Sequence, residues 1–362
     1  MLKILDRYII RKFLSTFFFV ALIFTLISVV IDYSAKVEKF IEEPITGKEI
    51  FLEYYPGFIL FINGLLWPLF TLIAVIFFSS RLAANTEIIA MLNAGVSFRR
   101  LLRPYMIAAT LIAMSSLMGN HYIIPLANQK RLHIEYTYLD HDKDKGKTRN
   151  VHLFVAPDTK VYINAYQKKN NTASQFRLEQ YDGQAVIKLI KAHAAEWMAV
   201  TGEWRLRNYE VRTFAALRES LSVQHGNQLD TSINLHPEDF IDYEEQQTMM
   251  TTTDLRAHIA KSETRGAGNI SKYKIELYRR SVDPVTIFIL TVIGVAVASR
   301  KSRGGTGIHL ALGIGLGAIF VFISRFSIVF ASGQVIPPLL GIWLPNIIFA
   351  GIALYLIRRA QA

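Results

Sequence analysis

Three basic residues stand where the chain could bind an anion. Arg325 is the only basic residue deep inside a long apolar run, which favours a charge that faces a cavity and binds an anionic head group. The alternative is an arginine whose side chain reaches back to the membrane surface. Lys36 and Lys39 share one helical face at the end of the first apolar run, and Asp32, four residues before Lys36, partly neutralises it.

A short segment between two apolar runs is a candidate docking helix. Asn85 or Thr86 is expected to cap it, Glu87 suits its positive first turn, and Gly95 closes it. Since a plain turn would suffice to reverse the chain, apolar residues at i, i+3, i+4 spacing favour a helix that seats in a groove of a partner protein. A helix that lies on lipid is the alternative. The candidate contact residues are Glu87, Ile88, Met91, Leu92 and Gly95.

No familiar catalytic pattern is present in the sequence. The nine histidines are scattered without an HExxH motif, and there is no GxSxG and no GxxxxGK[ST] loop. A chain without cysteine has no disulfide, thiolate metal site or cysteine nucleophile. We therefore predict that this chain is not an enzyme and holds no metal or cofactor. Uphill transport would need ATP hydrolysis in another subunit.

Six apolar segments are long enough to cross a membrane, since a helix needs roughly 20 residues to span about 30 Å of hydrocarbon. They lie near 13–32, 56–79, 101–124, 282–299, 308–331 and 337–357. The short segments on one side of them, including Arg300, Lys301 and Arg303, hold 13 of the 40 basic residues and 2 acidic ones, which equals the whole net charge of +11. Basic residues concentrate on the cytoplasmic side, so both termini are predicted to be cytoplasmic. This distribution explains the basic surplus without a nucleic-acid partner.

About 155 polar residues separate the third apolar segment from the fourth, and they alternate at strand period between turn signals such as Asp182-Gly183. This pattern favours an antiparallel sandwich or jelly roll. We predict an α-helical polytopic membrane protein with six transmembrane helices, in a 3+3 arrangement, and an inserted periplasmic all-β jellyroll-like domain. The predicted regions are 1–125 with three helices and the docking helix at about 86–95, 126–255 with the β domain, 256–281 as a helical connector, and 282–362 with three helices.

Four stretches carry a resemblance that covers essentially the full chain. They are Leu5–Ile9, Asn85–Gly95, Tyr273–Pro284 and Ile336–Pro345. In their order, and with the 3+3 topology, they resemble the LptF/LptG family, the paired permeases of the bacterial lipopolysaccharide exporter. The last stretch looks more like LptG than LptF.

The resemblance implies partners and a mechanism. This chain and an LptF-like second permease would form a cavity in the inner membrane that lipopolysaccharide enters from the outer leaflet. An LptB-like ATPase dimer would hold ATP and Mg and drive closure through the coupling helix, which matches Thr86–Gly95, with Glu87 in contact. The lipid would then pass to the periplasmic jellyroll, aligned with LptC-like and LptA-like proteins. LptG-like chains often carry a basic residue where Asp32 falls, so Lys36 or Arg325 is expected to compensate and, with Lys39, to bind lipopolysaccharide.

Other functions fit the sequence less well. A different ABC-type exporter permease typically has its periplasmic domain between the first two of four spans, whereas the insert here follows the third of six. A membrane-embedded enzyme that modifies envelope lipids or glycans needs a polar cluster with acid/base or nucleophile spacing, and the sequence shows none. A structural scaffold explains neither Arg325 nor the docking helix.

Overall fold

The computed structural model describes residues 3–139, 148–215, 218–240, 245–266, 270–299 and 305–361. They form two compact units, a membrane unit of Met1–Glu135, Gln247–Thr253 and Ser271–Ala362, and a β unit of Tyr136–Gln246 and Asp254–Ile270. Arg300, Lys301 and Arg303, which contributed to the charge argument, lie outside the described residues. The four regions given above remain a prediction.

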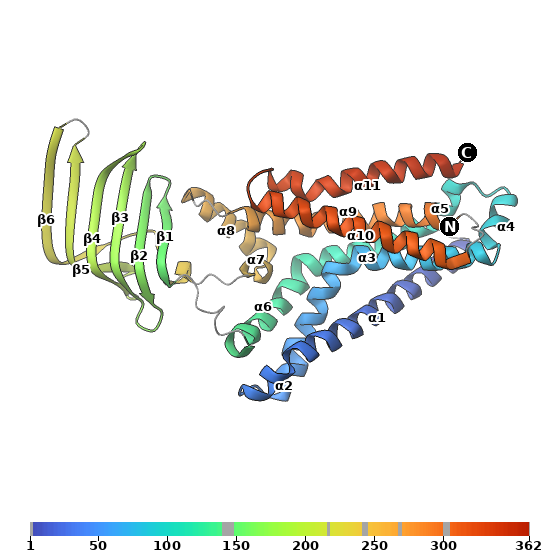
Figure 1. The fold of residues 1–362 in the computed structure, drawn as a ribbon, viewed down its shortest axis with the longest axis horizontal. Helices are drawn as coiled ribbons and strands as arrows, with labels where there is room; N and C mark the ends of the chain where they lie inside the picture. The colour runs from blue at the N-terminus through green and yellow to red at the C-terminus, as the bar shows by residue number, and fades with distance from the viewer. Residues whose placement is uncertain are drawn as a thin grey trace. The chain divides into compact units, whose positions relative to one another are not determined.

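The described residues of the chain contain six helical spans that are long and apolar enough to cross a membrane, which confirms the predicted number. The spans contain α1 (Ile4–Glu42), α3 (Tyr55–Ala84), α5 (Phe98–Met118) with α6 (Ile124–Ile134), α9 (Ser271–Ala298), α10 (Gly305–Ser332) and α11 (Pro338–Gln361). Short helices α2 (Gly47–Glu49) and α4 (Glu87–Asn93) lie on either side of α3 in the sequence (Figure 1). Helix α9 is the most enclosed of these spans. In its most apolar 18-residue stretch 61% is buried inside the protein, whereas the corresponding value for α1 is 11%.

Three π-helical turns occur among the described residues. Two of them interrupt the helices of the membrane unit, and the third begins at Glu135, the last residue of that unit before the β unit. They are η1 (Ile50–Tyr54), η2 (Gly119–Ile123) and η3 (Glu135–Leu139). The first two end two residues before a proline, Pro56 and Pro125. A proline has no N–H for the i→i−4 ladder and its ring crowds the carbonyl one turn earlier, so the preceding backbone widens. Such turns redirect side chains without ending the helix.

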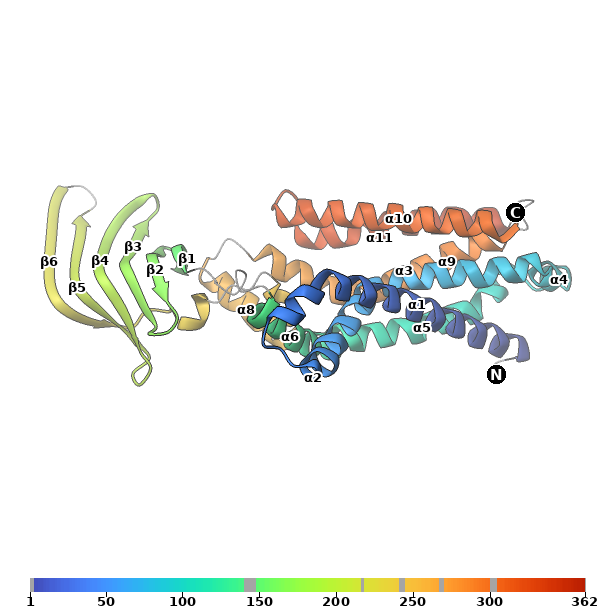
Figure 2. The same cartoon turned by 60° about the horizontal axis from the view of Figure 1, so that its bottom comes forward.

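Close helix contacts in the membrane unit depend on small residues. A Cβ added at Gly313 of α10 would lie 2.3 Å from Ile76 Cδ1 of α3, and one at Gly317 would lie 2.8 Å from Leu69 Cδ1. The two glycines therefore let α10 approach α3, as expected for small residues spaced by four in a membrane helix. Helices α10 and α11 run side by side in both views (Figure 2).

The β unit is built on one antiparallel sheet whose strands pair in chain order (Figure 1). The strands are β1 (Arg149–Ala156), β2 (Thr159–Gln167), β3 (Thr172–Asp182), β4 (Ala185–Met198), β5 (Glu203–Ala215) and β6 (Arg218–Thr231). Alternate residues enter an apolar core, in which Trp204 is fully buried and its Nε1 donates to Leu235 O at 2.7 Å. The inserted all-β domain is thus confirmed, and its described strands form a meander. Strand β6 is followed in the sequence by η5 (Pro237–Phe240), α7 (Gln246–Met249) and α8 (Thr252–Thr264).

Candidate coupling and anion-binding sites

The predicted docking helix is present as α4, but its first turn is not capped as expected. Thr86 has a left-handed backbone with φ of 63°, and its hydroxyl donates to Asn85 O instead of accepting from the helix. The capping prediction was therefore wrong, because a left-handed residue points its side chain away from the first N–H groups. Gly95 closes the segment with φ of 82°, where glycine has no steric penalty, as predicted.

Contacts with the first transmembrane helix orient the carboxylate of Glu87. Tyr8 Oη of α1 donates to Glu87 Oε2 at 3.3 Å, and Asn85 Nδ2 donates to Oε1 at 3.4 Å. Ile88 is completely buried in the core of the membrane unit, whereas Leu92 is 39% exposed. Ile88 therefore anchors α4 to its own chain and presents no surface to a partner, which corrects our expectation of a shared docking face.

A buried ion pair fixes the start of α1 beside α4. Both carboxylate oxygens of Asp6, which is 3% exposed, accept from Arg100 at 2.7 Å in a bidentate pair. Asp6 also accepts from the Lys3 backbone N–H at 2.9 Å. Because Arg100 lies in the first turn of α5, directly after α4, the ion pair and the Tyr8–Glu87 contact join one end of α1 to the whole 86–100 segment. Two parallel hydrogen bonds between an arginine and a carboxylate stabilise the contact and also fix the relative orientation of the two side chains.

The cation Lys36 lies in a cluster of paired charges at the other end of α1. Its Nζ is 2.8 Å from Asp32 Oδ1 and 3.6 Å from Glu135 Oε1, and it donates to Tyr54 Oη. Tyr54 in turn donates to Asp32 Oδ2 at 3.0 Å. The partial neutralisation of Lys36 by Asp32 is therefore present, and Glu135 strengthens it.

Arg131 completes this arrangement from α6. Its Nη1 lies 3.4 Å from Glu135 Oε2, its Nε donates to Asn128 Oδ1 at 2.7 Å, and its guanidinium stacks 4.6 Å from the centre of the Phe61 ring. We call Asp32, Lys36, Tyr54, Arg131 and Glu135 the Lys36 cluster. Its two carboxylates balance its two cations, so its formal net charge is zero. Arg131 and Glu135 were not among the residues predicted from the sequence, although their i, i+4 spacing was a usable signal.

The other two candidate cations lie on exposed parts of their helices. Arg325 of α10 is exposed, and within the described part of the chain it has no hydrogen-bond or ion-pair partner. Lys39 is exposed one turn beyond the Lys36 cluster. Among the described residues Arg325 shares no hydrogen bond or ion pair with the Lys36 cluster, so Arg325 and Lys36 are not joined in one preassembled site.

Among the described residues, no group of three or more His, Cys, Asp or Glu side chains is arranged to hold a metal ion. No curated protein sequence matches the chain closely enough to be reported. A family model described as lipopolysaccharide export system permease LptF/LptG matches residues 7–359, nearly the whole chain. The match covers both LptF and LptG, so the leaning towards LptG remains a prediction. The six spans, the inserted β unit and this match agree, and the chain belongs to the LptF/LptG family of lipopolysaccharide export permeases, which are transporter subunits and not enzymes.

Proposed function

We propose that this permease works in the bacterial inner membrane, with both termini cytoplasmic and the β unit periplasmic. It pairs with an LptF-like second permease, extracts lipopolysaccharide from the outer leaflet, and passes it towards LptC-like and LptA-like periplasmic proteins. The family match over residues 7–359 is the observation that carries this proposal. The concentration of basic residues in the short loops supports the orientation.

An LptB-like ATPase dimer, which binds ATP and Mg, drives this chain through α4. Around α4, Leu92 and Gly95 are exposed and the Glu87 carboxylate is half-buried, while Met91 is partly buried against the core. Tyr8 donates a hydrogen bond to Glu87, so a basic residue of the ATPase would meet an acceptor that α1 helps to orient. Ile88, held in the core, carries the resulting force into the membrane unit.

Lipopolysaccharide phosphates bind near Lys36, Lys39 and Arg325. Arg325 is the strongest candidate because its exposed charge has no acidic partner among the described residues. Lys36 is a weaker one in this state, since a phosphate must compete with two carboxylates already within 3.6 Å. Exposed apolar residues of α1 and α10, such as Phe18 and Phe322, suit acyl chains or the second permease.

Affinity purification of the chain from a membrane in which it is expressed with its neighbours tests the proposal. We expect a cytoplasmic ATPase, a second permease and lipopolysaccharide to co-purify. A stable homo-oligomer without ATPase or glycolipid would refute it. Glu87→Gln should lower ATPase recovery several-fold, because a charged pair contributes more than a neutral hydrogen bond. Glu42→Gln, at an exposed position on α1, is the matched control and should recover as much ATPase as the wild type.

A further inference from the structure

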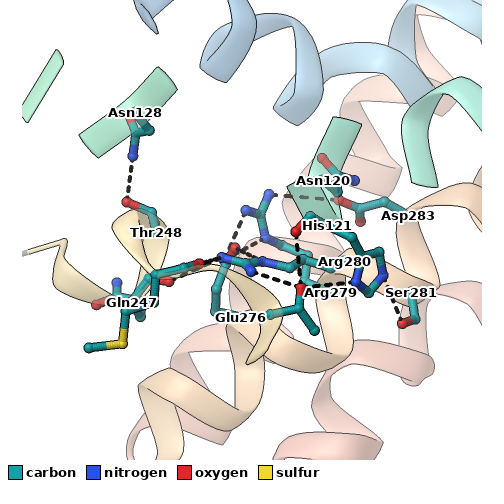
Figure 3. A network of polar contacts seen from close by, with 12 residues as sticks. Asn120, His121, Asn128, Gln247, Thr248, Glu276, Arg279, Arg280, Ser281 and Asp283 are labelled. Carbon is teal, nitrogen blue, oxygen red and sulfur yellow. Dashed lines mark hydrogen bonds and ion pairs between the residues drawn. The ribbon is translucent and has the colours of Figure 1, made fainter. Parts of the chain in front are cut away.

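The segment that returns from the β unit is bound into the membrane unit before α9 begins. Residues Gln247–Thr253 belong to the membrane unit although they lie between parts of the β unit in the sequence. They contain most of the short helix α7 and the start of α8. Polar contacts from α9, η2 and α6 hold this segment. Figure 3 shows these contacts around the first half of α9.

Arg280 of α9 is the centre of the contacts that hold this segment. It is 2% exposed, and its Nη2 donates to Gln247 O at 3.2 Å and Met250 O at 2.9 Å. Its Nη1 donates to Thr252 Oγ1 at 3.1 Å, and its Nε donates to Glu276 Oε1 at 3.0 Å (Figure 3). All three guanidinium nitrogens are thus used, and three of the four acceptors belong to the returning segment.

Glu276 supplies the countercharge and is shared with a second arginine. Its Oε2 accepts from Arg279 at 2.9 Å and 3.1 Å, while Oε1 accepts from Arg280. The spacing in Tyr273–Pro284 produces this arrangement, because residues three and four apart lie on one helical face. The function proposed above leaves this motif unassigned.

The outgoing part of the chain, before the β unit, contacts the same returning residues. His121 Nδ1 of η2 lies 3.0 Å from Thr252 Oγ1, and the Thr252 hydroxyl also lies 3.3 Å from His121 O. Further along, Asn128 Nδ2 of α6 donates to Thr248 Oγ1 at 2.7 Å (Figure 3). The outgoing and returning segments are therefore joined to each other as well as to α9. We call His121, Asn128, Thr248, Thr252, Glu276 and Arg280 the Arg280 network.

The burial of Arg280 makes separation of the network costly. A buried guanidinium is costly unless its donors are paired, so separation of the returning segment from α9 would leave the Nη1 and Nη2 donors of Arg280 without these acceptors. These bonds favour a segment that moves together with α9. Such a joint transmits displacement, whereas a flexible linker absorbs it.

We propose that the Arg280 network is a positioning site for transport, which fixes the returning segment to α9 so that movement of the membrane unit reaches the β unit. This inference rests on the proposed function and adds a role for residues that contact neither ATPase nor lipid. Loosening the network should leave ATP hydrolysis intact and reduce the lipopolysaccharide delivered for each ATP consumed.

Thr252→Val is the sharpest test, because it keeps the shape of the side chain and removes the hydroxyl that both Arg280 and His121 contact. Thr110→Val is the matched control, since the Thr110 hydroxyl is exposed and bonds Met106 O of its own helix. The purified complex, with its ATPase and second permease, is reconstituted in vesicles containing lipopolysaccharide. Rates of ATP hydrolysis and of transfer to a soluble jellyroll acceptor are measured, with hydrogen exchange of residues 247–253.

For Thr252→Val we expect faster hydrogen exchange in 247–253 and ATP hydrolysis within about twofold of wild type. Transfer per ATP should fall at least about fivefold, since each lost hydrogen bond contributes about 1 kcal/mol and the hydroxyl bonds both Arg280 and His121. Arg280→Lys should act in the same direction and replaces Thr252→Val if that variant is poorly assembled. Faster exchange with transfer per ATP equal to that of Thr110→Val would overturn the inference. The inference would also be overturned if ATP hydrolysis and lipopolysaccharide transfer fell by the same factor in Thr252→Val. A wild-type complex that hydrolyses ATP but transfers no lipopolysaccharide would instead refute the proposed function.

Discussion

Neutralising Asp32 should strengthen the binding of lipopolysaccharide, because this carboxylate lies beside the cation that phosphate would approach. Lys36 Nζ is 2.8 Å from Asp32 Oδ1, so a phosphate oxygen on the far side of the ammonium would be about twice as far, roughly 5–6 Å, from the carboxylate. At that distance two like charges repel by about 1 kcal/mol in water and by about 3 kcal/mol at an effective dielectric constant of about 20.

The intermediate burial of both side chains, 20% and 11% exposed, favours a value between these limits. Asp32→Asn should therefore tighten lipopolysaccharide binding by about 5- to 150-fold. The substitution keeps an acceptor for Tyr54 and leaves Glu135 beside Lys36, so the cluster retains most of its contacts. Its formal net charge changes from zero to +1.

Binding of lipopolysaccharide to the purified complex, titrated at one fixed salt concentration, measures this effect. Glu38→Gln is the matched control because it removes the same charge from an exposed position on the same helix. Screening by solvent should keep the affinity of that variant within about twofold of wild type. An Asp32→Asn variant with unchanged affinity, or one equal to Glu38→Gln, would refute the reasoning, since Asp32 would then not lie near a bound phosphate.

Two further predictions concern stability. Gly313→Ala should lower the thermal midpoint of the detergent-solubilised protein, because its Cβ would lie 2.3 Å from Ile76 Cδ1. Gly315→Ala, with nothing within 4 Å, should leave it unchanged or raise it, and equal midpoints would contradict this packing. In the β unit, burial raises the pKa of Asp239, but hydrogen bonds from Arg265 and a backbone N–H outweigh it and hold the pKa below its usual value. The resulting stabilisation is complete above the unfolded pKa of about 3.9 and is lost as pH falls through the folded-state pKa. The midpoint difference between wild type and Asp239→Asn should shrink below about pH 4, and a constant difference would contradict it.

The large-scale organisation could be predicted because it depends on patterns summed over many residues. Each of the six apolar runs, and the alternating pattern of the insert, extends over many residues. A single residue that departs from the pattern therefore does not change the predicted helix or strand. Gly95 was predictable for a local reason, since a left-handed position that closes a helix favours glycine. The left-handed Thr86 was not, because threonine carries no signal for that conformation.

The pairing within the sites depends on contacts between distant segments. Glu135 reaches Lys36 across almost a hundred residues, and no local pattern in either segment indicates the other. Ile88 was assigned to a partner surface because spacing alone tells which residues share a face, and not what that face contacts. The widened turns before Pro56 and Pro125 were predictable in principle, since each proline interrupts the helical ladder.

The three π-helical turns contribute residues to the Lys36 cluster and to the Arg280 network, which lie at the same end of the membrane unit. Tyr54 in η1 and Glu135 in η3 belong to the Lys36 cluster, and His121 in η2 belongs to the Arg280 network. Asn128 joins them, because its Oδ1 accepts from Arg131 and its Nδ2 donates to Thr248, each at 2.7 Å. One amide group cannot rotate without breaking both bonds. An anionic head group that drew Arg131 away from Glu135 would therefore disturb the segment held by Arg280, and we expect lipid binding and the position of the returning segment to be linked through Asn128.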